Sequence, residues 1–248
     1  MPHHVTNRER SYDGDGHLKV SSFTREAINA GSYILGGLAF VIGSLFFLPA
    51  LEAYRALGAW LFVAGSLVYL AVTLHDLAEV VRHARKSSSA GRTLHLEMAS
   101  TLLYALGSIL FVVGSACFLP ALEAHVFGAW AFIVGSLVFV VGATINVRLV
   151  TQAGTNLMLQ LFNGIAILFM LGSSLFVVAS IPYLWEGIGA PSEKTLRTYL
   201  AAEFIAASVI FFVAGGLNFY RAWAAHRFYR GNGGRAQDSS VSGEAASR

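Results

Sequence analysis

The sequence predicts an all-α polytopic membrane protein, with six transmembrane helices built as three tandem helical hairpins. Three observations predict this fold class: the composition, the spacing of the uncharged segments and a duplicated stretch. Of the residues, 55% are hydrophobic and only 12% are charged, and the mean hydropathy is +0.60. Soluble globular domains carry about 25% charged residues, so this composition indicates a chain that resides in the bilayer.

Uncharged segments mark the expected spans, because a helix needs about 20 apolar residues to cross the hydrocarbon core. Five such segments are clear: 27–51, 56–74, 98–122, 126–147 and the apolar part of 157–185. A sixth, 204–220, is short, since at 1.5 Å per residue it covers about 25 Å. Either this helix is short or Glu203 lies inside the membrane.

Basic residues predict the orientation, because cytoplasmic loops are enriched in Lys and Arg. Of the 17 Lys and Arg residues, only Arg55, Lys194 and Arg197 fall in the turns after the first, third and fifth spans. Both termini are therefore expected in the cytoplasm, where the polar segments 1–22 and 231–248 should be disordered. The net charge of +3 follows from this bias and requires no nucleic-acid partner.

A duplication predicts how the spans are arranged. "FLPALEA" occurs at 47–53 and again at 118–124, and the flanking helices also match. We therefore expect one hairpin repeat at 23–86 and a second at 94–152. A divergent third copy is expected at 156–230, where "LAAEFIAASVIFF" stands in the place of "GAWLFVAGSLVYL". Each copy has two spans, so all three hairpins should face the same way.

The repeated proline and glutamate have two interpretations. Pro49 and Pro120 should end the first helix of each hairpin and begin a short turn, where a missing N–H is no loss. Glu52 and Glu123 then lie early in that turn, where exposed N–H groups favour a carboxylate. A paired external cation site is the alternative. We favour the first interpretation, because a duplication copies structural signals as readily as it copies a site.

Glycines recur at intervals of seven residues in the first four spans, which places them on one stripe of each helix. Such stripes let another backbone approach closely, and the serines beside them can hydrogen-bond across the contact. The predicted helix-packing residues are Gly36, Gly43, Gly58, Gly65, Gly107, Gly114, Gly128, Gly135 and Gly142.

Glu203 is the candidate proton or cation site, because acids inside a membrane are costly and usually face a bundle interior or water. The interpretation that we favour is structural: the helix begins after Ser192 and carries Glu203 just below the headgroups. A further expectation concerns Asn163 and Asn218, which fall at similar depth on antiparallel helices. We expect them to share an interhelical hydrogen bond.

His75, Glu79 and His83 recur every four residues and form a candidate metal site on one helical stripe. The second copy holds Ile145, Leu149 and Ala153 at the corresponding positions. A solvated helix end is therefore the favoured interpretation, and no metal or cofactor is expected.

The pattern of an apolar helix with "GS", a turn after "FLP", and then "GAW" before a second "GS" resembles the YrhK-like domain, a two-helix bacterial membrane module. The resemblance covers 31–78 and 102–147 well and 158–220 loosely. It implies tandem helical hairpins in a bacterial plasma (inner) membrane. It implies no activity, cofactor or binding residue.

The expected function is that of a non-catalytic integral membrane protein: a scaffold, accessory subunit or lipid-ordering module acting through its glycine/serine-striped helices. Membrane lipids, a membrane-protein partner or a second copy of the chain are the expected partners. The sequence contains no HExxH, CxxC, nucleophile elbow or phosphate loop, so no enzyme is expected. The alternative is a small-solute or ion (proton or cation) transporter or channel using Glu203. Hairpins that all face one way argue against the inverted repeats of many transporters.

Overall fold

The computed structural model describes residues 20–86, 91–149, 156–185 and 193–245, and these residues form helices and turns without any strand. The helices are α2 (Val20–Leu45), α3 (Arg55–Lys86), α4 (Arg92–Cys117), α5 (His125–Leu149), α6 (Asn156–Ser180) and α7 (Glu193–Ala245), with short 3-10 helices η1 (Pro49–Tyr54) and η2 (Ile181–Leu184). Six segments of this described part are long and apolar enough to span a membrane. The predicted fold class is confirmed, and the chain is an integral membrane protein.

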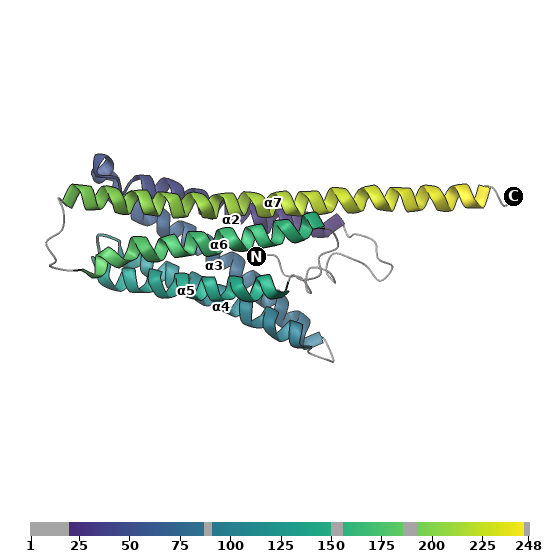
Figure 1. The fold of residues 1–248 in the computed structure, drawn as a ribbon, viewed down its shortest axis with the longest axis horizontal. Helices are drawn as coiled ribbons and strands as arrows, with labels where there is room; N and C mark the ends of the chain where they lie inside the picture. The colour runs from purple at the N-terminus through teal and green to yellow at the C-terminus, as the bar shows by residue number, and fades with distance from the viewer. Residues whose placement is uncertain (1–19, 87–90, 150–155, 186–192, 246–248) are drawn as a thin grey trace.

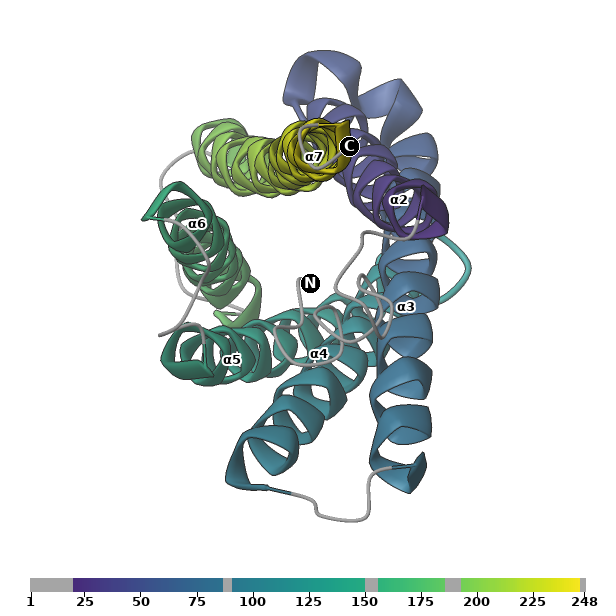
Figure 2. The same ribbon diagram turned by 90° about the vertical axis from the view of Figure 1, so that its right-hand side faces the viewer.

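The six long helices form a closed ring in chain order. Each helix packs against the next one, and α7 packs against α2 to close the ring, as Figure 2 shows in a view along the bundle. We call the end with η1, η2 and the α4–α5 turn the turn end, and the opposite end, where α2 and α4 begin, the terminal end. At the terminal end α7 extends well beyond the other helices (Figure 1).

The first helix of each hairpin ends shortly before a proline at the turn end. Pro49 is the first residue of η1, and Pro182 is the second residue of η2. Pro120 lies in a turn in which the amides of Leu122 and Glu123 bond to the carbonyl oxygen of Leu119, at 3.0 and 3.1 Å. This turn places Glu123 in the left-handed region, with φ at 45°. In both copies of the duplicated stretch the helix therefore ends three or four residues before the proline, although the two turns differ in shape.

Two helices extend into segments for which the sequence predicts disorder. Helix α2 begins at Val20, inside the segment 1–22 that was expected to be disordered, and α7 continues to Ala245, through most of 231–248. Residues 1–19 and 246–248 lie outside the described part of the chain. A helix already nucleated in the membrane adds each further residue at little cost, even where the composition is polar.

Layers of three aromatic side chains fill the centre of the helix ring. The centroids of Phe62, Phe132 and Phe204 lie 6.0 to 6.4 Å from one another, and each side chain is 2% exposed. These residues occupy the same position in the second helix of each hairpin. The first helices supply a second triplet, Phe40, Phe111 and Phe176, in which Phe176 lies 6.3 Å from Phe40 and 5.1 Å from Phe111. The third hairpin thus takes the same place in the core as the first two.

The predicted glycine stripes lie inside the hairpins, where they make room for these rings. A Cβ at Gly43 would lie 2.8 Å from the Phe62 ring, and one at Gly114 would lie 2.8 Å from the Phe132 ring. The same glycines also approach the opposite backbone: a Cβ at Gly58 would lie 2.8 Å from the carbonyl oxygen of Gly43. Gly36, Gly65, Gly107, Gly128 and Gly135 are similarly tight, whereas Gly142 leaves ordinary contact distances of 3.4 Å or more.

Serines join one hairpin to the next. The hydroxyl of Ser66 on α3 lies 3.0 Å from that of Ser115 on α4, and Ser44 on α2 lies 2.9 Å from Ser208 on α7. The seam between α5 and α6 lacks such a bond, because the buried Ser136 hydroxyl has no hydrogen-bond partner. Glycine pairs therefore hold the first two hairpins together, and serine pairs connect two of the three seams.

We expect Gly58→Ala to destabilise the ring by roughly 1–3 kcal/mol, because the added methyl group would meet the backbone of Gly43. Gly216→Ala is the matched control: it lies in α7 with nothing within 4 Å of its Cβ position, so higher helix propensity should leave stability equal or greater. Thermal unfolding in one mild detergent measures both. Equal stability of the two variants would contradict the packing described here.

Candidate functional site

A layer of buried polar residues lies near the terminal end of the bundle. Asp76, Asn146 and Asn218 occupy the same position in α3, α5 and α7, and they are 4%, 4% and 5% exposed. All three fall within the segments that are long and apolar enough to span a membrane. Burying polar side chains at such depth costs free energy, so this layer is a candidate functional site.

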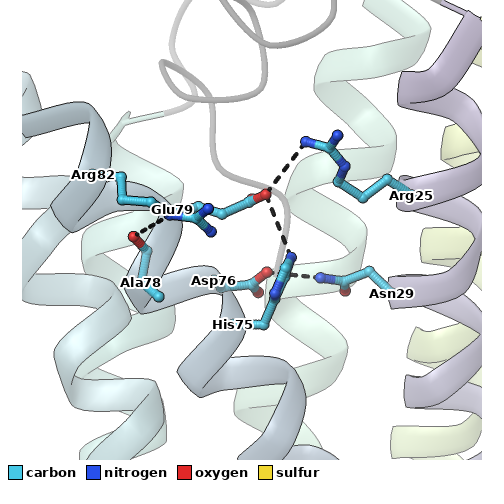
Figure 3. A network of polar contacts seen from close by, with 7 residues as sticks. All are labelled: Arg25, Asn29, His75, Asp76, Ala78, Glu79 and Arg82. Atoms are coloured by element: carbon cyan, nitrogen blue, oxygen red, sulfur yellow. Dashed lines mark hydrogen bonds and ion pairs between the residues drawn. The ribbon is translucent and has the colours of Figure 1, made fainter. Parts of the chain in front are cut away.

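In the first hairpin the layer is a network between α2 and α3 (Figure 3). The Asn29 amide donates to Asp76 Oδ1 at 2.7 Å, which gives the buried carboxylate a partner on the neighbouring helix. One turn closer to the terminal end, Glu79 Oε1 lies 3.6 Å from Arg25 Nη1 and 3.4 Å from His75 Nε2. The network therefore fastens α2 to α3 where the two helices leave the apolar core.

Arg221 fastens the seam that closes the ring. Its Nη2 lies 3.1 Å from Glu26 Oε2 on α2, and its Nε donates to Asn218 Oδ1 at 3.2 Å. Its guanidinium also lies 4.9 Å from the ring centroid of Phe162 on α6. With side chains only 7% and 14% exposed, Arg221 and Glu26 form a largely desolvated ion pair that links the first span to the last.

The second hairpin contributes Glu97, the counterpart of Glu26, at 2% exposure. Nearby, the Ser100 hydroxyl donates to the carbonyl oxygen of Gly142 at 3.0 Å, which joins α4 to α5. The layer as a whole thus holds buried carboxylates in both of the first two hairpins. Among the described residues, no three His, Cys, Asp or Glu side chains gather closely enough to hold a metal ion.

The residues singled out from the sequence do not come together in one site. His75 and Glu79 lie side by side at the terminal end, but Glu79 shares its carboxylate with Arg25. Glu203 is half-buried nearer the turn end, within the apolar segment of α7 and beside Tyr199. Helix α7 begins at Glu193, where the sequence predicts its start.

The two other polar pairs differ from expectation. The predicted bond between Asn163 and Asn218 is wrong: Asn218 accepts from Arg221, and Asn163 Oδ1 is buried without a hydrogen-bond partner. Glu52 is paired with Arg197, whose Nη1 lies 2.6 Å from its Oε1. The Glu52 carboxylate, which a cation site would need, is therefore already paired with an arginine.

Sequence reasoning missed most of the polar layer, although a signal was present. The comparison of repeats set His75, Glu79 and His83 beside apolar residues of the second copy. Asp76, the residue after His75, aligns with Asn146 of the second copy. The repeat therefore retains a polar side chain at this position. Glu97 was overlooked for another reason, since it served only to mark where an uncharged segment begins.

Comparison with known proteins identifies the first two hairpins. Residues 25–81 and 95–149 each match the family model of the YrhK-like protein. No curated protein and no solved structure matches the chain significantly. The two matched regions coincide with the hairpins α2–α3 and α4–α5, so the first two hairpins of the chain carry the YrhK-like domain as a tandem repeat.

Proposed function

We propose that this protein is a non-catalytic scaffold or accessory subunit of a bacterial inner membrane, with both termini in the cytoplasm. The observation that carries the proposal is the filled axis of the ring. A transport path along the bundle would have to pass the mutually contacting rings of Phe62, Phe132 and Phe204, each 2% exposed. A dry, tightly packed centre supports a structural role over conduction.

The contacts of the glycine and serine residues support the same proposal. In the described residues, the stripes are engaged within hairpins and at the seams, so they form the ring itself. A partner would therefore meet the outward-facing apolar side chains or the part of α7 that projects beyond the ring (Figure 1). An accessory subunit that anchors a long cytoplasmic helix fits this shape.

The proposed orientation follows from the charges at the two ends. Arg25, Arg82, Arg85, Arg148 and Arg227 lie at the terminal end. The turn end holds Arg55, Lys194 and Arg197. The positive-inside rule then places the terminal end, and with it the projecting helix, on the cytoplasmic side.

Reconstituted protein should not conduct. Liposomes that contain the wild-type chain are expected to show the same proton and K⁺ flux as empty liposomes, because the aromatic core excludes water from the axis. Flux above the empty-liposome level, abolished in a Glu203→Gln variant, would instead support the transporter alternative.

A scaffold should also retain a partner. Extraction of the tagged full-length protein from its native membrane in mild detergent, followed by quantitative mass spectrometry, is expected to recover a second protein in fixed ratio. Recovery of the chain alone, or only with further copies of itself, would contradict the accessory-subunit proposal.

A further inference from the structure

The turn end holds a pocket above the last aromatic triplet of the axis. Its floor includes Phe47, Phe118 and Tyr183, which occupy the same position in the three hairpins. The rings of Phe118 and Tyr183 contact each other at 5.0 Å between centroids. Only the third copy replaces phenylalanine by tyrosine here, so a single hydroxyl group is added to the floor.

Basic side chains surround this pocket. Arg55 and Arg197 line it, and His125 lies against the floor, with its ring centroid 5.3 Å from that of Phe118. Each of these three residues precedes by seven positions the phenylalanine that its hairpin contributes to the mid-bundle triplet of Phe62, Phe132 and Phe204. Seven residues are nearly two helical turns, so all three basic groups face the axis two turns above that triplet. Helices α3 and α5 begin at Arg55 and His125, and their N-terminal ends add positive potential.

One carboxylate enters the pocket. Glu52 lines it and bonds to Arg197 Nη1 at 2.6 Å, so the pocket already binds a carboxylate of its own chain. Arg55, in contrast, has no carboxylate partner within the described residues. The pocket thus keeps an excess of positive charge, together with an uncompensated guanidinium.

We propose that the turn-end pocket binds a phosphate group between Arg55 and Arg197. The planar, multidentate donors of arginine suit the oxygens of phosphate, and the Tyr183 hydroxyl supplies a further donor at the floor. Glu52 acts as an internal competitor that occupies Arg197 when the pocket is empty. The phosphate group comes either from a soluble phosphate or from a lipid headgroup, because the pocket lies where the spans end.

Two probes separate these sources in titrations of the purified full-length protein by isothermal calorimetry. Inorganic phosphate represents the soluble source, and short-chain dihexanoyl phosphatidic acid represents the headgroup. Binding of both probes would show that a soluble phosphate is sufficient to fill the site. Binding of the lipid alone would assign the site to a lipid headgroup. Either result supports the proposal, and the absence of saturable binding of both probes overturns it.

Variants locate the site. Arg55→Gln should weaken binding by about tenfold or more, the effect of losing a charged hydrogen bond. Glu52→Gln should tighten it, because the internal competitor is removed. Glu123→Gln is the matched control, since Glu123 is the counterpart of Glu52 in the second FLPALEA and does not line the pocket. Its affinity should equal that of the wild type.

An affinity of Arg55→Gln equal to that of the wild type would overturn the proposal. Arg55 is the decisive position, because its replacement breaks no ion pair among the described residues and should leave the fold intact. Thermal unfolding of each variant verifies this. The outcome is independent of the flux and co-purification experiments, so failure of the phosphate site would leave the scaffold proposal standing.

Discussion

The fold depends on the fit between glycine and an aromatic ring across each hairpin. Glycine lacks the side chain that would hold two helices apart, so the phenylalanine on the facing helix can reach the axis. Gly43 makes this room for Phe62, and Gly114 makes it for Phe132. In α2 to α5 both residue types recur every seven positions, so each of these helices presents a glycine stripe and an aromatic stripe side by side. The third hairpin keeps the aromatic positions, so the rings of all three hairpins meet as triplets that fill the centre of the bundle.

Residues at equivalent positions of the three hairpins form different polar arrangements at the two ends of the ring. At the terminal end, Asp76, Asn146 and Asn218 share one position, and around them the hairpins have diverged into distinct bonds, including the Arg221–Glu26 pair that closes the ring. At the turn end, the basic positions surround a pocket instead. The apolar centre separates these two polar ends, which favours a protein that acts at its surfaces and not through its interior.

Much of this fold could be predicted from local features of the sequence. Uncharged runs locate the spans, and FLPALEA locates the hairpin turns, because both signals lie within a few residues of the structure they specify. Closure of the ring could not be predicted, since the contact between α2 and α7 joins the two ends of the chain through residues such as Ser44 and Ser208, which no local pattern connects. The burial of Glu26 and Glu97 could not be predicted either, because a charge can mark the end of a span or lie buried within it, and only the neighbouring helices decide which.

A disulfide across the α2–α7 seam would test whether the ring closes within one chain. The Ser44 and Ser208 hydroxyls lie 2.9 Å apart, so Ser44→Cys and Ser208→Cys, introduced after Cys117→Ser, should form an intramolecular bridge on mild oxidation in the membrane. Ser66→Cys with Ser115→Cys serves as the positive control, because it joins neighbouring helices at 3.0 Å. If the ring closes within one chain, both pairs should give a bridged monomer. A bridge for the control pair alone, or only intermolecular dimers through the α2–α7 pair, would contradict it.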